Sequence, residues 1–305
     1  MRLGIDIGGT KTAALVLDRT GTVVALAEKP SGRGEDATMT VAAEVARSVV
    51  RRVGGWDAID AAGACMPGLV DPRTGWARHA VNLDVRSLDL AGEMQRRLGW
   101  RPVVDNDVKA AALGAHHGIR GGGAGTTAYL NVGTGLAAAI VHGGRVLRGP
   151  GDAAGEIGHL PVGSGVPCSC GQQGCLETLA SGSALARMWG RPAGELFPAA
   201  ATGDAEAIAA VRTLARGTAL AVQVLVLTGA EVVAVGGGVT RSGPALTEAV
   251  TADIVARECD SAFLQRLDLT KRFTVLASDV PVEAIGAALL PGALDPGTLA
   301  SVVAR

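Results

Sequence analysis

A cluster of metal-binding side chains lies just past the middle of the chain. His159 is followed by Cys168, Cys170 and Cys175 in a glycine-rich segment, so one imidazole and three thiols fall within seventeen residues. This is the closed tetrahedral set that Zn²⁺ favours, and a closed set leaves no position for a catalytic water. The pattern predicts a structural zinc ion that orders the loop. Reduced cysteines without a metal are the alternative.

Glycine-rich turns form a second kind of candidate site. Asp6 ends the first apolar run and precedes Gly8, Gly9, Thr10 and Lys11, while Gly133, Thr134 and Gly135 stand between two later apolar runs. Glycine lets the backbone approach a phosphate and present its N–H groups, and a carboxylate such as Asp6 can hold Mg²⁺. Each turn alone could be an ordinary hairpin. Together they predict two phosphate-binding hairpins, and no lysine follows a glycine as a Walker A loop requires.

An acidic triplet, Asp105-Asn106-Asp107, opens a predicted helix. A carboxylate at this place is favoured by the helix dipole, so Asp107 could be a simple helix cap. It could equally be a general base, with the Asn106 amide binding a neighbouring hydroxyl. Glu156 and Glu177 flank the cysteine loop, where carboxylates can accept hydrogen bonds from sugar hydroxyls or remain solvated surface groups.

Composition narrows the class of protein. The chain has 305 residues, a net charge of −1, 48% hydrophobic and 19% charged residues, which is typical of a globular protein and gives no support to nucleic acid or an anionic membrane as a partner. The longest apolar run, Ala219–Ala230, falls short of the ~18 residues of a membrane helix. The N-terminus does not resemble a signal peptide. We therefore expect a cytoplasmic protein.

The order of predicted elements indicates an α/β fold with a repeat. Arg2–Ile7, Ala13–Asp18 and Thr22–Glu28 are predicted as an antiparallel meander, and strands then alternate with helices. The predicted helices include Thr38–Val53, Leu88–Leu98, Asp107–His117, Thr213–Thr228 and Glu283–Leu290. After the glycine-rich segment at 120–125, the strand–glycine–strand order restarts, with strands predicted over Thr126–Val132 and Leu136–His142. We expect a small domain over residues 1–118 and a large one over 119–290 that carries the cysteine loop. The tail, about 291–305, is expected to pack back on the small domain.

These motifs together resemble the ROK family of bacterial sugar kinases and sugar-responsive repressors. The matching stretches are Asp6–Lys11, Pro67-Gly68, Asn82-Leu83, Asn106-Asp107, Gly133–Gly135, Gly155–His159, the Cys168–Glu177 loop and Gly236–Gly238. The resemblance covers residues 3 to about 290. It implies a two-domain actin-like, hexokinase-type fold (duplicated ribonuclease H-like), with an active site in the cleft between the domains and a homodimer or homotetramer as the assembly.

The resemblance also implies roles for individual residues. Asp107 is similar to the base that takes a proton from the sugar hydroxyl. The implied sugar-binding set is Gly68, Asn82, Asn106, Asp107, Glu156, His159 and Glu177. The implied nucleotide and Mg²⁺ set is Asp6, Gly8, Gly9, Thr10, Lys11, Gly133, Thr134, Gly135, Gly237 and Gly238. His159, Cys168, Cys170 and Cys175 match the zinc ligands of the family.

The predicted function is transfer of the γ-phosphoryl group of MgATP to a hexose. Among the hexoses, glucose is the first candidate, and its product would be glucose 6-phosphate. Two departures from the family pattern bear on this: Ala137–Ala139 replace glycines after the second turn, and Lys109 follows the presumed base. The alternatives are a kinase of an N-acetylhexosamine, of fructose or of a C7 cyclitol such as a valiolone, and a non-catalytic sugar-binding relative. A repressor needs a helix-turn-helix, for which the sequence before Asp6 leaves no room.

Overall fold

The computed structural model describes residues 1–293 and consists of two compact units. The first unit contains residues 1–124, 143–146 and 281–293. The second contains residues 125–142 and 147–280.

The first unit is built on a five-stranded sheet in the order β3-β2-β1-β4-β8. Its strands are β1 (Arg2–Ile7), β2 (Lys11–Leu17), β3 (Val23–Pro30), β4 (Ala61–Met66) and β8 (Val103–Asn106). β1, β2 and β3 pair antiparallel, whereas β1, β4 and β8 pair parallel. The predicted meander followed by parallel strands is therefore confirmed.

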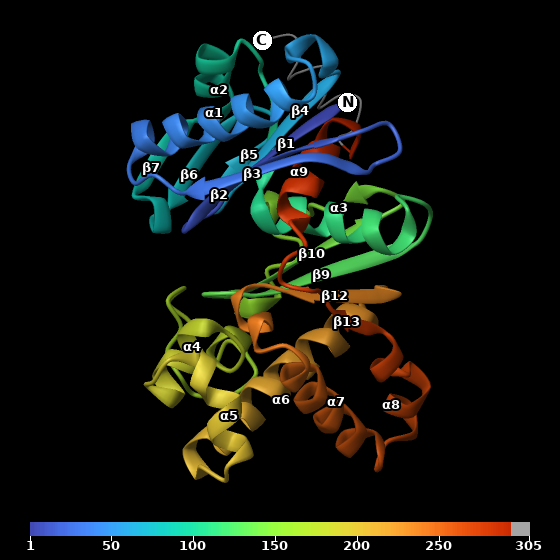
Figure 1. Cartoon of the computed structure of the whole chain (residues 1–305). Helices are drawn as coiled ribbons and strands as arrows, with labels where there is room; N and C mark the ends of the chain where they lie inside the picture. Colours follow the sequence, from blue (N-terminus) through green and yellow to red (C-terminus); the bar gives the residue numbers. More distant parts are fainter. Residues whose placement is uncertain (294–305) are drawn as a thin grey trace. The chain divides into compact units, whose positions relative to one another are not determined.

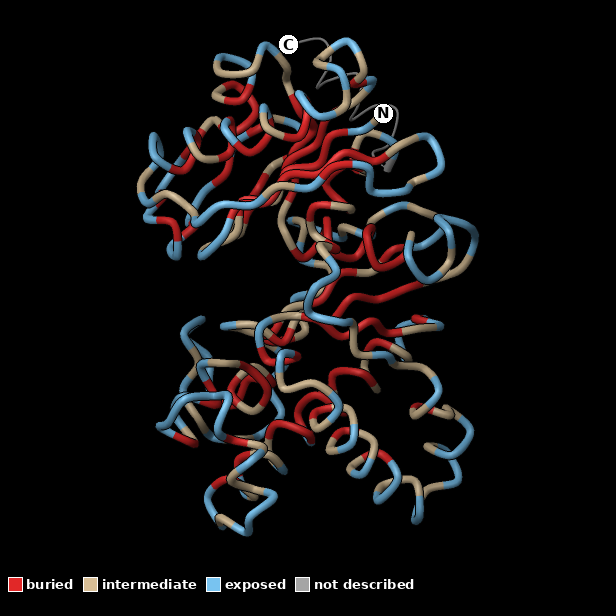
Figure 2. Tube along the Cα trace, in the orientation of Figure 1, coloured by how far each residue is buried: buried red, intermediate tan, exposed pale blue. Residues whose placement is uncertain are grey.

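Helices cover both faces of this sheet (Figure 1). α1 (Glu35–Arg52) packs on one face, and α9 (Val282–Ala293) and α3 (Asp107–Arg120) pack together on the other. α9 approaches so closely that a Cβ on Gly63 would lie 1.9 Å from the carbonyl oxygen of Ala287, and one on Gly286 would lie 1.6 Å from that of Ala110. Only glycine fits at such contacts. Figure 2 shows the resulting band of buried backbone along the strands.

A small antiparallel sheet in the first unit was not predicted. It consists of β5 (Leu69–Asp71), β6 (Trp76–Ala80) and β7 (Val85–Asp89), in the order β5-β6-β7. β7 takes the first residues of the helix predicted over Leu88–Leu98. The helix itself, α2 (Leu90–Leu98), begins after Asp89, whose carboxylate accepts a hydrogen bond from the Gly92 N–H as an N-cap.

The second unit repeats the strand plan. β9 (Thr126–Val132) pairs antiparallel with β10 (Leu136–His142) and parallel with β12 (Val232–Gly236), which pairs parallel with β13 (Phe273–Val275). A short strand, β11 (Arg145–Val146), follows β10 in the sequence. The helices of this unit are α4 (Gly182–Trp189), α5 (Leu196–Ala201), α6 (Ala205–Leu227), α7 (Pro244–Glu258) and α8 (Ala262–Leu267). The predicted repeat of topology is thus present in the two sheets.

α6 is longer than the sequence suggested. The predicted helix covered Thr213–Thr228, and the structure begins it at Ala205, where Asp204 accepts hydrogen bonds from the N–H groups of Glu206 and Ala207. By length and composition alone this helix could cross a membrane, contrary to the expectation from the apolar runs, but half of its apolar window is buried in the protein. It packs against α5 and α7 and against β9 and β12, as a core helix does.

The predicted final helix belongs with the first unit. It was expected over Glu283–Leu290 at the end of a domain spanning residues 119–290, whereas α9 is grouped with residues 1–124 because it packs on β1, β4 and α3. The domain boundaries given by the sequence remain a prediction. The tail that was expected to pack on the small domain lies, from residue 294 onward, outside the described residues.

Candidate functional site

In the first unit, the candidate residues gather at the carboxyl ends of three neighbouring parallel strands. Asp6 lies near the end of β1, Gly68 follows β4, and Asn106 and Asp107 lie where β8 meets α3. In parallel sheets such strand ends meet at one edge, where ligands bind. The fold therefore brings together motifs that are far apart in the sequence.

Asn106, rather than Asp107, caps helix α3. Its side-chain oxygen accepts hydrogen bonds from the N–H groups of Val108 (2.9 Å) and Lys109 (3.4 Å), and its Nδ2 donates to the Gly68 carbonyl at 3.0 Å. Gly68 has φ +95°, and a Cβ there would lie 2.4 Å from the Arg78 carbonyl oxygen. Asn106 is therefore the N-cap, and Asp107, the first residue of the helix, accepts a hydrogen bond from the Val108 N–H with Oδ1.

The carboxylate of Asp107 has the properties of a general base. Burial raises its pKa to about 6, hydrogen bonding from the Val108 N–H opposes this rise, and the negative charge of Glu283 adds to it. A carboxylate with a pKa near 6 is still ionised at neutral pH, yet is more basic than an exposed aspartate.

Asp6 lies in the same acidic neighbourhood. Burial raises its pKa well above the ordinary value, and the charges of Glu283 and Asp107 raise it further. The thiol of Cys65, which pairs with Asp6 in the register of β1 and β4, donates to Asp6 Oδ1 over 3.6 Å. A half-buried carboxylate among like charges is a favourable place for a hard divalent cation with oxygen ligands, so Asp6 fits the Mg²⁺ role.

The turn between β1 and β2 is held by Ser31, the residue that follows β3. The Ser31 hydroxyl donates to the Gly8 carbonyl oxygen at 2.6 Å, and the Ser31 N–H donates to that of Thr10 at 3.1 Å. A Cβ on Gly9 would lie 2.9 Å from the Cβ of Asn82, so the turn contacts the predicted sugar-binding asparagine. The ammonium group of Lys11 forms an exposed ion pair with Glu28 at 2.9 Å, and the nucleotide role of Lys11 stays a prediction.

The corresponding turn in the second unit, between β9 and β10, is held by the start of α4. The Gly182 N–H donates to the Gly133 carbonyl oxygen at 2.7 Å, and both the N–H and the hydroxyl of Ser183 donate to that of Thr134, at 3.1 and 2.7 Å. On the other side of the turn, the Leu136 N–H donates to Glu177 Oε2 at 2.9 Å. The turn is thus fixed from both ends.

The predicted metal ligands converge. The ligand atoms of His159, Cys168, Cys170 and Cys175 all lie within 4.8 Å of one another. Cys168 Sγ is 3.8 Å from His159 Nδ1, and the sulfurs of Cys170 and Cys175 are 3.7 Å apart. Sulfur ligands at about 2.3 Å around a tetrahedral Zn²⁺ stand roughly 3.8 Å apart, so the donor set fits this ion. Because Nδ1 of His159 faces the cysteine sulfurs, Nε2 is the ring nitrogen that the cluster does not use.

The third glycine turn lies beside the second. Gly236 pairs with Asn131 in the parallel register of β12 and β9, so the turn that follows it lies beside the end of β9. Gly237 has φ +98°, and a Cβ there would lie 2.6 Å from the carbonyl carbon of Val132. Gly238 has open space around it, consistent with a backbone that a ligand can approach.

The two departures from the family pattern are largely internal to the protein. Ala138 and Ala139 are buried in β10, where they pair with Leu130 and Tyr129. Ala137 is half-buried. Lys109 is 7% exposed, so its side chain packs within the first unit instead of standing in solvent beside Asp107.

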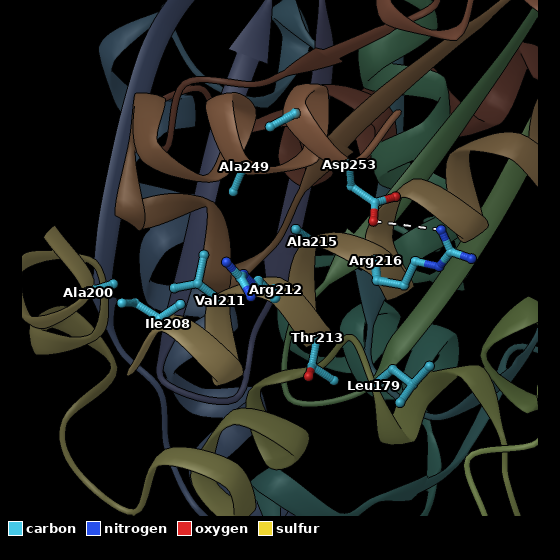
Figure 3. A pocket seen from close by; sticks show the side chains of 11 residues that line it. Leu179, Ala200, Ile208, Val211, Arg212, Thr213, Ala215, Arg216, Ala249 and Asp253 are labelled. Carbon is cyan, nitrogen blue, oxygen red and sulfur yellow. Dashed lines mark ion pairs between the residues drawn. The ribbon is translucent and has the colours of Figure 1, made fainter. Parts of the chain in front are cut away.

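A pocket of about 770 Å³ lies apart from these residues in the second unit (Figure 3). It is bounded by α5, α6 and α7, with mainly apolar side chains such as Ile208 and Val211 and an ion pair between Arg216 and Asp253 at 3.7 Å. None of the predicted site residues lines it.

Glu156, which was predicted to bind sugar, is exposed at the start of the 3₁₀ helix Ile157–His159.

Several residues at the site were missed by sequence reasoning. Glu283 and Cys65 stand beside Asp6, while Ser31 and Ser183 hold the two turns. Only Glu283 carried a signal, as an acidic residue in the first turn of a predicted helix. The other three are single small polar side chains whose partners lie far away in the sequence.

Comparisons with known proteins agree with this geometry. The ROK family model matches residues 2–276. A glucokinase from Halalkalibacterium halodurans is 30% identical over 81% of this chain and 83% of its own length. The structure of a ROK hexokinase from Thermus thermophilus aligns with a TM-score of 0.78 at 31% identity, covering 95% of this chain and 97% of that one. A ROK glucokinase from Streptomyces griseus, solved with glucose and AMPPNP, aligns at 0.72 and 28% identity, covering 94% and 97%.

The repeated sheets, the acidic strand ends and the glycine turns define a carbohydrate kinase with the two-domain actin-like, hexokinase-type fold. The chain belongs to the ROK family.

Proposed function

We propose that the chain is an ATP-dependent hexose kinase that converts glucose to glucose 6-phosphate. The observation that carries this proposal is Asp107, a half-buried carboxylate with a pKa of about 6 at the amino end of α3, beside the acidic Asp6. The relatives named above are a glucokinase and a structure bound to glucose and AMPPNP, which supports the same substrates here.

The reaction needs little more than positioning and charge neutralisation. Asp107 accepts the proton of the sugar hydroxyl while that oxygen forms a bond to the γ-phosphorus and the bond to the β–γ bridging oxygen breaks, releasing ADP. Asp6 would hold the Mg²⁺ of the nucleotide. The Gly8 and Gly133 N–H groups already donate to the carbonyl oxygens of Lys11 and Gly135, so the N–H groups assigned to the phosphates are those of Gly9, Thr10, Thr134 and Gly135. Gly237 and Gly238 lie on the nucleotide side.

Sugar recognition is assigned to residues of both units. In the first unit these are Gly68, Asn82 and Asn106. In the second unit Glu156, His159 and Glu177 are assigned to bind hydroxyls. A zinc ion on His159, Cys168, Cys170 and Cys175 would supply structural rigidity and no chemistry, since all four of its ligands come from the protein. It also leaves the imidazole of His159 in one orientation.

The test is ADP formation from MgATP with glucose, mannose, fructose, N-acetylglucosamine, N-acetylmannosamine and a valiolone-type cyclitol, for the wild type and Asp107→Asn. Glucose-dependent turnover that falls by about 10²–10⁴ in the variant supports the proposal. Turnover on another member alone keeps the kinase and changes its substrate, because one hydroxyl contact can decide specificity. No turnover on any sugar contradicts it.

The proposal extends to the setting of the enzyme. We propose that it acts in the cytoplasm as a homodimer or homotetramer, with no nucleic acid or membrane partner. Light scattering coupled to size-exclusion chromatography gives the mass of the particle, and a monomer would contradict the assembly.

A further inference from the structure

Glu177 makes contacts that its predicted sugar-binding role does not explain. Its Oε2 accepts a hydrogen bond of 2.9 Å from the Leu136 N–H, the first residue after the Gly133–Gly135 turn. A hydrogen bond from a backbone N–H to an ionised carboxylate is stronger than one between neutral groups. The same oxygen would lie 2.4 Å from a Cβ on Gly135. The carboxylate of Glu177 can therefore occupy this position because Gly135 has no side chain.

The backbone of Glu177 is itself fixed, so its carboxylate is aimed at the turn. Glu177 lies in the 3₁₀ helix Leu176–Thr178, whose Leu176 and Thr178 are buried. Its carbonyl oxygen accepts from the Ser181 hydroxyl at 2.9 Å, and the Thr178 hydroxyl donates to the Cys175 carbonyl oxygen at 2.7 Å. The segment therefore runs from a predicted zinc ligand to the carboxylate in two residues.

We infer that Glu177 is a positioning residue for the phosphate-binding turn, in addition to any contact with sugar. It fixes the start of β10 and with it the N–H groups of Gly133–Gly135. The inference rests on the proposed function for the identity of the ligand, a nucleoside diphosphate or triphosphate with Mg²⁺. If Glu177 fixes the turn, nucleotide affinity depends on a carboxylate that the family resemblance assigns to sugar binding.

The experiment measures MgADP binding to the sugar-free protein by isothermal titration calorimetry. Glu177→Ala is expected to weaken MgADP binding about tenfold, because a hydrogen bond to a charged group is lost. Glu177→Gln keeps an acceptor oxygen for the Leu136 N–H and is expected to stay within about threefold of the wild type. Glu156→Ala, at the other predicted sugar carboxylate, is the matched control and is expected to raise the KM for sugar without changing MgADP affinity.

Zinc content and the thermal midpoint show whether each variant is folded. Unchanged MgADP affinity in Glu177→Ala would overturn the inference, as would an equal loss in Glu177→Gln and Glu177→Ala.

A second readout separates this inference from the proposed function. Hydrogen exchange of the peptide containing Leu136, measured without any ligand, is expected to be faster in Glu177→Ala than in the wild type and Glu177→Gln. If the wild type binds no MgADP, the proposed function fails, and the exchange result alone then decides whether Glu177 holds the turn. Equal exchange in Glu177→Ala and the wild type would overturn the inference.

Discussion

The two glycine turns have the same place in their sheets but are supported by different chemistry. In the first unit, the turn between β1 and β2 is held by one neutral side chain. This is the hydroxyl of Ser31, the residue after β3, which donates to the Gly8 carbonyl oxygen. The turn of the second unit, between β9 and β10, is held by the carboxylate of Glu177 and by the start of α4.

The difference follows from what surrounds each turn. In the first unit, the edge carries the acidic group formed by Asp6, Asp107 and Glu283, so a further carboxylate would add repulsion. In the second unit, Glu177 stands two residues after Cys175, a predicted zinc ligand. A zinc ion bound there would make this segment rigid, so we expect the second turn to depend on the cysteine cluster and the first turn not to.

The largest expected effect comes from removing the zinc ligands. Cys175→Ser is expected to lose the roughly one equivalent of zinc per chain and to lower the rate of ADP formation on the order of 100-fold, because the segment that holds the second turn loses its anchor. Metal analysis and a coupled ADP assay measure both quantities. Cys259→Ser, at an exposed cysteine outside the cluster, is the control. Full activity in metal-free protein would show that the second turn does not depend on zinc, and would contradict the proposed difference between the two turns.

A smaller effect is expected from crowding the second turn. In Gly135→Ala the new Cβ would stand 2.4 Å from Glu177 Oε2, whereas in Gly133→Ala it would stand 3.2 Å from the side chain of Asn131. Overpacking costs about 1–3 kcal/mol, so the KM for ATP should rise about tenfold in the first variant and less in the second. Steady-state kinetics at saturating sugar measure this. A larger rise in KM for Gly133→Ala than for Gly135→Ala would mean that the Glu177 side chain moves away from the new methyl group at little cost.

The acidic group of the first unit gives a pH dependence. Asp107 must be ionised to accept a proton, and its pKa is about 6, so kcat/KM is expected to fall as the pH is lowered through about 6. Because the charge of Glu283 raises this pKa, Glu283→Gln should move the acidic limb of the profile to lower pH. A pH–rate profile of both proteins, corrected for stability, tests this. An unmoved limb in Glu283→Gln would contradict the assigned cause.

The smallest effect compares the two serines. Ser31→Ala removes the hydroxyl that holds the Gly8 carbonyl, and Ser183→Ala removes one of two donors to the Thr134 carbonyl. Each lost hydrogen bond is worth about 1 kcal/mol, and the second turn retains its backbone donors. The KM for ATP should therefore rise a few-fold in Ser31→Ala and less in Ser183→Ala. Equal effects would show that the second turn needs its hydroxyl as much as the first.

Local patterns in the sequence were sufficient for part of this description. The first strand, β9 and β10 have the predicted bounds, because alternation of apolar residues and flanking glycines depends on near neighbours alone. The cysteine spacing likewise predicted a cluster whose atoms converge. The small sheet β5-β6-β7 was missed because its strands are three to five residues long, too short for a periodic signal.

What the sequence determined by itself is the chemistry available: a thiol and imidazole set for zinc, two glycine turns, and Asp6 and Asp107 as acidic groups. Those properties follow from residue type and short spacing. The tertiary structure alone decided that Asn106 donates to the Gly68 carbonyl oxygen, that α9 brings Glu283 beside Asp6, and that Glu177 reaches the Leu136 N–H. These contacts join residues separated by tens to hundreds of positions, and only the packing of helices on sheets fixes such distances.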